Sequence, residues 1–403
     1  MIERDVFKIL ENELARKPIT ALVGARQTGK TTSLQYLLKQ LETEAVFITF
    51  DDNEILKIFN ENIGLFIEQY IKPYKYIFID EFQYAPEGGK KLKLIFDTVW
   101  RKMFISGSSK AELAINSLGY LVGRVSIIEM QTVSFEEFVK YKSPQKALLF
   151  TKVRSSIDFQ QLMPEFVEFM TYGGYPAVIT ENNFENKKKL LQDIIATYLL
   201  REIKDILGYK NSRVFDSVIS RLAIQNGKLT NISKLSNDLN INWNLTSEII
   251  SVLIKTGIII EVKPFFSNKA KELIKMPKLY FHDNGFVNSI IKNFGVPDER
   301  IDKGEIFESF VLHELINKNH ECKYWNRQRS EVDFILEHDS KITAIEVKSK
   351  LKRMPVSLKR FLDMYQITKA MVLNENLDNN VVYETTNVQL LHLFNIVNLS
   401  KTL

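Results

Sequence analysis

The feature that most constrains this chain is a glycine-rich loop set between an apolar run and a helical pattern. Residues Gly24–Thr31 fit the spacing G-x-x-x-x-G-K-[ST], and Thr20–Val23 before them form the apolar run. Leucines at positions 34, 37, 38 and 41 follow at helical spacing. In a strand–loop–helix turn, backbone N–H groups surround phosphate oxygens and the helix N-terminus adds positive potential. The order therefore predicts a triphosphate-binding loop.

The polar residues of this loop have expected roles at a nucleotide. The Lys30 ammonium would reach the β- and γ-phosphates, and the Thr31 hydroxyl would be a ligand of Mg²⁺. Arg26 lies inside the loop, where we expect a structural role. We expect ATP and Mg²⁺ as cofactors, and the residues predicted to bind ATP are Gly24, Ala25, Arg26, Gln27, Thr28, Gly29, Lys30, Thr31 and Thr32.

An acidic pair completes the predicted nucleotide site. The apolar run Tyr76–Ile79 ends at Asp80 and Glu81. An acidic residue at the carboxyl end of a buried parallel strand points into the crevice where ligands bind. We expect Asp80 to hold Mg²⁺ through water and Glu81 to orient the attacking water. Gln83 is a further candidate for positioning that water.

Two other polar positions near strand ends are candidates with a competing interpretation each. Ser106 follows the fourth apolar run and could contact the γ-phosphate or the water, with Ser108 as the next candidate; a small-residue turn is the alternative. Arg124 precedes the fifth apolar run and is predicted to neutralise transition-state charge, in its own site or a neighbour's. A surface ion pair is the alternative for Arg124.

The pattern of apolar runs predicts an α/β fold. Runs at 20–23, 46–50, 76–79, 103–105 and 125–128 are continuous rather than alternating, which is typical of parallel strands covered by helices on both faces. Residues 1–150 are thus predicted to form a P-loop core and 151–208 a helical lid. In 209–282, two amphipathic helices precede two strands, the order of a winged helix. Residues 283–403 form a second α/β unit.

A second candidate site lies in this last unit. Asp333 alternates with apolar neighbours on one predicted strand, and Glu346 and Lys348 leave the same face of the next strand. Glu308 lies on the inward face of the preceding helix. Asp333, Glu346 and the Val347 carbonyl would hold Mg²⁺, Glu308 is a further predicted metal-site residue, and Lys348 would steady an anionic nucleophile. The alternative is a solvated strand face with a Glu–Lys pair.

Charge and composition bear on partners. The net charge is +5, which alone does not indicate a nucleic-acid partner. Lysines nevertheless cluster around the predicted wing, and the second helix offers Asn and Thr side chains but no Arg for guanine. We therefore expect double-stranded or branched DNA without sequence specificity, and weigh protein docking about equally. The wing lysines are Lys263, Lys269, Lys271, Lys275 and Lys278.

The cysteine count and hydropathy suggest a compartment. The single cysteine, Cys322, excludes an internal disulfide and a Cys-rich zinc site, so a reducing cytoplasmic location is expected. No stretch approaches the roughly 20 apolar residues of a membrane helix, so we expect no membrane partner.

The motifs together resemble a known family. Gly24–Thr31, Ile79–Gln83, Ser106–Ser108, Gly123-Arg124 and Gly173–Pro176 are similar to archaeal-type P-loop ATPases, relatives of the AAA+ and STAND classes. The resemblance implies ATP binding and a C-terminal region holding a winged helix and a restriction-endonuclease-like fold with a PD-(D/E)XK site. One departure is the lack of a clear second sensor arginine, for which Arg201 is the candidate.

These expectations combine into two hypotheses. The first is an ATP-hydrolysing enzyme that processes or senses DNA, with Mg²⁺ at both sites and a homo-oligomer as a possible assembly. The second is a nucleotide-controlled signalling switch whose C-terminal domains bind protein or DNA without cutting.

Overall fold

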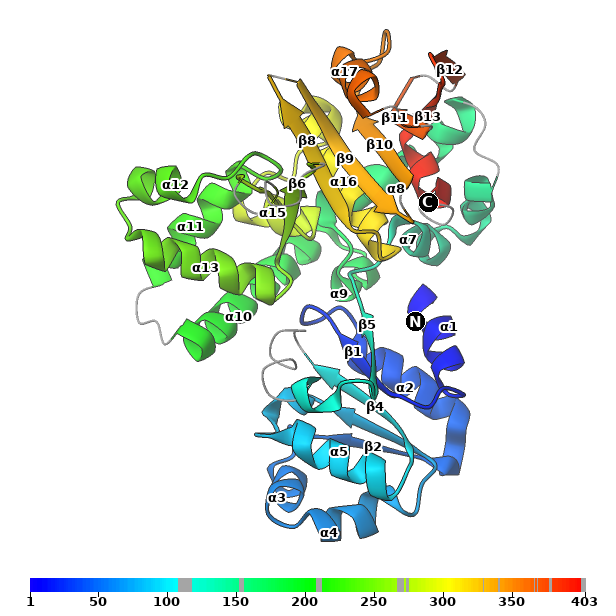
Figure 1. Ribbon diagram of the computed structural model, residues 1–403, viewed down its shortest axis with the longest axis vertical. Coiled ribbons are helices and arrows are strands. Elements are labelled where there is room, and N and C mark those ends of the chain that lie inside the picture. The colour runs from blue at the N-terminus through cyan, green and yellow to red at the C-terminus, as the bar shows by residue number, and fades with distance from the viewer. Residues whose placement is uncertain are drawn as a thin grey trace. The chain divides into compact units, whose positions relative to one another are not determined.

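The computed structural model describes the chain in two compact units (Figure 1). One comprises residues 1–132 with 255–257, and the other comprises 133–254 with 258–403. The first unit therefore ends before the boundary expected at 150. The description omits residues 108–117, 152–155, 208–211, 267–271, 273–274, 329, 340, 366, 368, 377–378 and 400–403. For residues 198–207 it covers the helical backbone only.

A parallel sheet organises the first unit, as predicted from the continuous apolar runs. Its strand order is β2-β3-β4-β1-β5, and each neighbouring pair runs parallel. The glycine-rich loop follows the central strand β1, at the carboxyl edge of the sheet. The strands are β1 (Ile19–Val23), β2 (Ala45–Thr49), β3 (Tyr76–Asp80), β4 (Lys102–Gly107) and β5 (Val125–Glu129).

Both faces of this sheet are buried. Leu22 and Phe78 pack into one apolar cluster with the α1 and α2 side chains. Their strand neighbours Ala21 and Ile79 pack into a cluster on the opposite face. Successive residues of a strand point to opposite faces, so both being buried explains why the runs do not alternate. The covering segments are α1 (Asp5–Glu13), α2 (Lys30–Leu41), η1 (Glu42–Glu44), α3 (Asn53–Glu61), α4 (Ile63–Phe66), η2 (Ile67–Ile71), η3 (Phe82–Tyr84), α5 (Gly88–Thr98) and η4 (Leu118–Leu121).

Helices occupy much of the second unit. None of the helices within the described residues is long and apolar enough to cross a membrane. The helical segments are α7 (Phe135–Lys142), η5 (Pro144–Thr151), α8 (Ser156–Tyr172), α9 (Pro176–Thr180), α10 (Phe184–Leu207), α11 (Ser212–Ile224), α12 (Ile232–Leu239), α13 (Trp243–Lys255), α15 (Asn284–Ile290), η6 (Pro297–Glu299), α16 (Lys303–Asn317), α17 (Val356–Tyr365), η7 (Leu393–Asn395) and α18 (Ile396–Leu399).

A mixed sheet forms the rest of the second unit, in the order β12-β13-β11-β10-β9-β8-β6-β7. Strand β6 pairs antiparallel with β7 and parallel with β8, where Lys263 lies opposite Lys323. The sheet therefore continues across residue 282, and a domain boundary there stays a prediction. The strands are β6 (Ile259–Pro264), β7 (Lys278–Phe281), β8 (Cys322–Arg327), β9 (Ser330–His338), β10 (Lys341–Val347), β11 (Lys369–Asn374), β12 (Asn379–Tyr383) and β13 (Thr386–His392).

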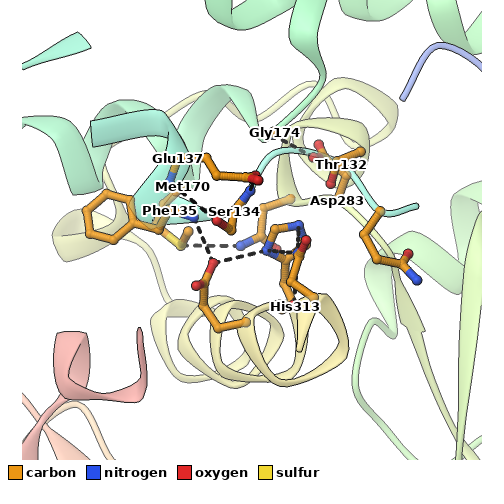
Figure 2. Close-up of polar contacts among 12 residues, drawn as sticks. Thr132, Ser134, Phe135, Glu137, Met170, Gly174, Asp283 and His313 are labelled. Atoms are coloured by element: carbon orange, nitrogen blue, oxygen red, sulfur yellow. Dashed lines mark hydrogen bonds and ion pairs between the residues drawn. The ribbon is translucent and has the colours of Figure 1, made fainter. Parts of the chain in front are cut away.

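The Gly173–Pro176 turn has a clear structural reason. Gly173 has a φ of +77°, and a Cβ there would lie 1.9 Å from Asp283 Oδ1. The Gly174 N–H donates to Asp283 Oδ2 over 2.6 Å, as Figure 2 shows. Only glycine accepts both the backbone conformation and the close approach. The turn thus fastens the end of α8 around a buried aspartate that precedes α15.

A second buried contact in the same region joins α7 to α16. The Phe135 N–H at the start of α7 donates to Glu314 Oε1 over 2.8 Å, and His313 lies beside that carboxylate (Figure 2). The Phe135 ring packs edge-on against Phe310, also on α16. A side chain 179 positions away thus satisfies an N–H at a helix N-terminus.

Candidate functional site

The glycine-rich loop adopts a conformation that only glycine permits at two positions. Gly24, directly after β1, has a φ of +153°, and a Cβ there would lie 2.1 Å from the Met130 carbonyl oxygen. Gly29, with a φ of +99°, is the N-cap of α2. The loop therefore places the N-terminus of α2 behind its own backbone, the arrangement that the spacing predicts.

Main-chain carbonyls hold the polar side chains of the loop. Lys30 Nζ donates to the carbonyls of Gly24 and Ala25 over 2.9 and 2.8 Å. Thr28 Oγ1 donates to the Ala25 carbonyl over 2.9 Å. The Lys30 ammonium thus lies inside the curl of the loop, where a phosphate chain would meet it.

Arg4 supports the loop from behind and was not predicted. Its guanidinium donates to the carbonyls of Thr28 and Gln131, over 3.0 and 2.8 Å. The side chain is 7% exposed. An isolated arginine near the N-terminus forms no motif, so the sequence offers no signal for this contact. It ties the loop to the segment after β5.

Asp80 lies at the centre of a hydrogen-bonded chain across the carboxyl edge of the sheet. Thr31 Oγ1 donates to Asp80 Oδ2 over 2.8 Å. Ser106 Oγ donates to Asp80 Oδ1. The structure therefore brings together predicted residues from three elements: α2, β3 and β4. Hydroxyl and carboxylate oxygens side by side form a ligand set that suits Mg²⁺.

Glu81 occupies a constrained position beside this chain. Its φ is +55°, in the left-handed region that is unusual for a non-glycine residue. The Glu81 N–H donates to Ser106 Oγ over 3.3 Å, and Gln83 Nε2 donates to Glu81 Oε2. Ser106 thus contacts both acidic residues, which makes it a positioning residue in this arrangement. Strain of this kind gathers at functional sites.

Arg124 is not brought to the nucleotide loop. It precedes β5, at the amino edge of the sheet, and its Nε pairs with Asp97 Oδ1 at 2.9 Å. A strand of five residues separates this edge from the loop by roughly 16 Å. The position matches the surface ion pair among the two interpretations, and the only transition-state role it leaves is in a neighbouring molecule's site.

The remaining predicted positions are quickly placed. Arg26 is half-buried in the loop, and Gln27 and Thr32 are exposed. Gln27 has a φ of +61°. Ser108, Lys269 and Lys271 lie outside the described residues, as does the side chain of Arg201.

In the second unit, the predicted metal-binding oxygens surround the ammonium of Lys348. Its Nζ lies 2.8 Å from Glu346 Oε1, 2.9 Å from the Val347 carbonyl oxygen and 3.7 Å from Asp333 Oδ2. The Val347 N–H donates to Asp333 Oδ2 over 2.7 Å. Strands β9 and β10 bring these groups together, as the spacing predicts. The convergence of three oxygens on one positive charge identifies a place that favours a cation.

Glu308 belongs to a neighbouring part of the same cluster. Tyr280 donates to Glu308 Oε2 over 3.0 Å, and Lys278 Nζ lies 3.6 Å from that oxygen. Lys278 also pairs with Glu331 and is buried. Lys278 therefore faces carboxylates, and it is not a wing lysine available to DNA.

Burial dominates the titration of this cluster. It raises the pKa of Glu346 to about 8, with the charge of Asp333 adding to the rise. It raises the pKa of Glu308 to about 8 for the same two reasons. The pKa of Asp333 is also raised by burial, although Lys348 and Lys278 oppose the shift. The neighbouring carboxylates raise the pKa of Lys348 despite its desolvation. These carboxylates therefore take up protons at a higher pH than exposed carboxylates do.

One observation at this site opposes the predicted set of metal ligands and another supports part of it. No group of three or more Asp, Glu, His or Cys side chains within the described residues is close enough to hold one metal ion. Glu308 therefore does not complete a ligand set with the other two carboxylates. Glu346 Oε2 is nevertheless buried without a hydrogen-bond partner among the described residues. Asp333, Glu346 and the Val347 carbonyl remain as a fitting set for one hard cation.

Comparisons with known proteins agree with the N-terminal site. Residues 16–139 match the AAA domain family, and residues 163–296 and 303–398 match two domains of unknown function, DUF8612 and DUF4143. An uncharacterized protein of Methanocaldococcus jannaschii is 27% identical over 357 residues, which cover 85% of this chain and 76% of that protein. An uncharacterized protein of Mycobacterium tuberculosis is 23% identical over 355 residues, 86% of this chain and 73% of that protein.

A solved structure was also compared. The Walker-type ATPase of Pyrococcus abyssi covers 72% of this chain and 96% of its own, with 15% identity and a TM-score of 0.47. The family match of residues 16–139 together with the strand–loop–helix geometry defines the first unit: it carries a P-loop ATPase domain of the AAA type.

Proposed function

We propose that this chain binds and hydrolyses ATP with Mg²⁺ at the carboxyl edge of the first sheet. The observation that carries the proposal is the chain Thr31–Asp80–Ser106, in which two hydroxyls donate to one carboxylate beside the glycine-rich loop. The two hydrogen bonds hold the Asp80 carboxylate in one orientation before a nucleotide binds. Preorganisation of this kind accounts for much of the catalysis of phosphoryl transfer.

Each residue has a role in this proposal. Lys30 exchanges its two carbonyl acceptors for β- and γ-phosphate oxygens, and the loop N–H groups hold the chain. Thr31 and Asp80 would hold Mg²⁺, which would supply positive charge to the phosphates. Glu81, held by Gln83 and Ser106, orients the water for attack.

Two substitutions test the nucleotide site. Lys30→Ala removes the phosphate contact and should abolish ATP binding measured by calorimetry. Glu81→Gln keeps the volume and should leave ATP binding intact while hydrolysis falls by roughly 10²–10⁴-fold. Lys39→Ala, on an exposed position of the same helix, is the control. Unchanged affinity in Lys30→Ala would overturn the proposal.

A second proposal concerns the C-terminal cluster, where we infer a PD-(D/E)XK nuclease-like, metal-dependent site. Its support is the convergence of three oxygens on Lys348 Nζ. A divalent cation held by Asp333 and Glu346 would polarise a phosphodiester, while Lys348 moves to the anionic nucleophile. The competing interpretation, a Glu–Lys pair without a metal, predicts no metal affinity.

Metal binding and cleavage are measured separately. Calorimetry with Mn²⁺ should show one site in the wild type that Asp333→Asn removes and Glu337→Gln leaves intact, since Glu337 is an exposed residue of the same strand that pairs with Lys323. A nicking assay on supercoiled and branched DNA with Mg²⁺ or Mn²⁺, with and without ATP, tests cutting. No nicking of any substrate by the folded chain would sink the nuclease activity.

We further propose DNA as a partner of a winged helix at 209–282, between a lid at 151–208 and a nuclease-like domain at 283–403. Helices α12 and α13 followed by β6 and β7 have the winged-helix order. Exposed Lys263 and Lys275 remain available for phosphate. Thr246, by contrast, is buried and donates to the Asn242 carbonyl, so it is not a base-reading residue.

The alternative, a nucleotide-controlled switch with a protein partner, makes the opposite prediction about DNA. A DNA-processing or DNA-sensing ATPase should hydrolyse ATP faster when DNA is added. A switch should change its protein association with ATP and ignore DNA. Sedimentation with ATP and Mg²⁺ tests the homo-oligomer, in which Arg124 would reach a neighbour's site.

A further inference from the structure

A cleft opens at the edge of the first sheet that is opposite to the nucleotide loop. It has a volume of about 680 Å³, in the range of ligand-binding cavities. Three segments line it, each at or directly before the start of a strand: 14–17 before β1, 72–76 at the start of β3, and 100–102 at the start of β4. The cleft therefore lies in the first unit, at the edge of the sheet opposite to the predicted nucleotide site.

The lining of this cleft is strongly basic. Among the described residues, no carboxylate is part of the lining, whereas six cationic side chains are: Arg16, Lys17, Lys72, Lys75, Arg101 and Lys102. The carboxylates that pair with them from outside are fewer: Glu13 with Arg16 and Lys102, Glu44 with Lys75, and Glu68 with Lys72. An excess of positive charge is thus focused in a concave site.

The outer lysines are available to a ligand. Lys72 and Lys75 are about half exposed, and so are the carboxylates that pair with them. Exposed ion pairs of this kind contribute little to stability, so an anion can replace the carboxylates at little cost. Lys17 Nζ lies over the Trp100 ring, 6.0 Å from its centroid. Three exposed ammonium groups, those of Lys17, Lys72 and Lys75, therefore line the cleft.

Two partly buried cations instead hold the walls of the cleft in place. The Arg101 Nε donates to the Tyr74 carbonyl over 2.9 Å, which ties the loop before β3 to the loop before β4. Lys102 Nζ donates to the Pro18 carbonyl and to Thr20 Oγ1, over 2.6 and 2.8 Å. The cleft is therefore preformed, which lowers the entropic cost of binding.

Aromatic rings complete the lining: Tyr74, Tyr76 and Trp100. Trp100 is 57% exposed and has a φ of +47°, unusual for a bulky residue. Trp100 therefore presents much of its indole to solvent beside Lys17. Flat aromatic faces between cations are what single-stranded nucleic acids use, because bases stack on the rings while phosphates meet the cations.

We propose that this cleft binds a nucleotide unit of single-stranded nucleic acid, with the phosphate on Lys17, Lys72 and Lys75 and the base on Trp100. An acidic peptide would use the lysines but would gain nothing from the indole face. A free nucleotide carries the same base and phosphate, so the test below separates it from a strand.

The experiment uses the full chain and a short fluorescein-labelled oligodeoxythymidylate, followed by anisotropy. One variant combines Lys17→Glu, Lys72→Glu and Lys75→Glu. Its control makes the same change of charge at three exposed positions elsewhere on the unit, Lys39, Lys57 and Lys93. The second variant is Trp100→Ala. Melting temperatures of all the variants should match the wild type, because every substituted side chain is exposed.

The expected result is at least a tenfold loss of affinity in the lysine variant and roughly a tenfold loss in Trp100→Ala, with the control near wild type. The salt dependence of binding should also become shallower in the lysine variant. If dTMP displaces the labelled oligonucleotide with the same affinity as the unlabelled oligonucleotide, the ligand of the cleft is a free nucleotide, and the proposed contacts to phosphate and base stand.

Two outcomes would overturn the proposal. In the first, oligonucleotide affinity is the same in wild type, lysine variant and Trp100→Ala, so that any binding lies elsewhere. In the second, poly-glutamate binds more tightly than the oligonucleotide and loses affinity only in the lysine variant, so that the partner is an acidic peptide. Because ATP hydrolysis is measured on the same variants, failure here and failure of the ATPase proposal are distinguishable.

Discussion

Replacing Ser106 by alanine removes the hydroxyl that donates to the Asp80 carboxylate at the carboxyl edge of the first sheet. Ser106 is fully buried, donates to Asp80 Oδ1 and accepts the Glu81 N–H. In Ser106→Ala, Asp80 keeps only the donation from Thr31 among the side-chain hydrogen bonds described for it. A buried carboxylate that loses a donor is left short of hydrogen bonds.

The magnitude follows from the charge of the acceptor. A hydrogen bond to a charged group contributes about 1.5–3 kcal/mol, so we expect the free energy of unfolding of Ser106→Ala to fall by about 2 kcal/mol. This fall corresponds to roughly 30-fold faster hydrogen exchange of the backbone amides of β3. Ser33→Ala is the matched control, because Ser33 is equally buried but donates to the neutral Gly29 carbonyl. Its loss should be about 1 kcal/mol, roughly fivefold in exchange.

The Mg²⁺ requirement of ATP hydrolysis should distinguish Ser106→Ala from Ser33→Ala more clearly than the free energy of unfolding does. Partners that orient a metal ligand change metal affinity by about 10–100-fold, so the Mg²⁺ concentration for half-maximal ATP hydrolysis should rise by that factor in Ser106→Ala. Ser33→Ala should keep the wild-type requirement. Hydrogen–deuterium exchange and an ATPase assay titrated with Mg²⁺ measure both quantities. If both variants show the same Mg²⁺ requirement, Ser106 does not position Asp80 and the reasoning fails.

Three further predictions concern the second unit. Lys348→Met removes the ammonium among the carboxylates, so Mn²⁺ should bind about tenfold more tightly in calorimetry, and a weaker affinity would contradict competition. Gly173→Ala places a Cβ 1.9 Å from Asp283 Oδ1 at a φ of +77° and should cost about 2–3 kcal/mol in denaturant unfolding; Gly119→Ala, with no atom within 4 Å, should cost far less. Burial lowers the pKa of His282 to about 3, so below pH 6.5 the unfolded chain binds a proton that the folded chain does not bind. The free energy of unfolding should therefore decrease as the pH falls below 6.5, by about 2 kcal/mol at pH 5. His282→Gln should make the free energy of unfolding less dependent on pH in this range.

The first sheet was predictable from sequence because its central strands β1, β3 and β4 are buried on both faces. Their short continuous apolar runs favour parallel strands over alternating ones, and the described strands β1–β5 match the five predicted runs. The edge strand β12 was missed, because its residues are largely exposed and it begins with two asparagines. Helix α15 was missed for the opposite reason: Gly285–Ser289 are all buried, so no amphipathic period marks it.

The sites divide in the same way between local and long-range information. The loop, Asp80 and the β9–β10 pair depend on spacing within one or two elements, and that spacing predicted which residues meet. Charge pairing depends on the whole fold. The sequence could not distinguish Lys278, which is buried against Glu308, from its exposed neighbours in the wing. Arg4 reaches across 127 positions to Gln131, a contact with no sequence pattern.

The C-terminal cluster contains more negative than positive groups, and this imbalance bears on its purpose. Two lysines, Lys278 and Lys348, face four carboxylates: Glu308, Glu331, Asp333 and Glu346. An inert structural pair would balance its charges, because an uncompensated buried carboxylate costs several kcal/mol. Bound protons, or the divalent cation proposed above, would reduce this excess of negative charge. The oxygens of Asp333, Glu346 and Val347 converge on Lys348 Nζ, and this is where we propose that the cation would bind.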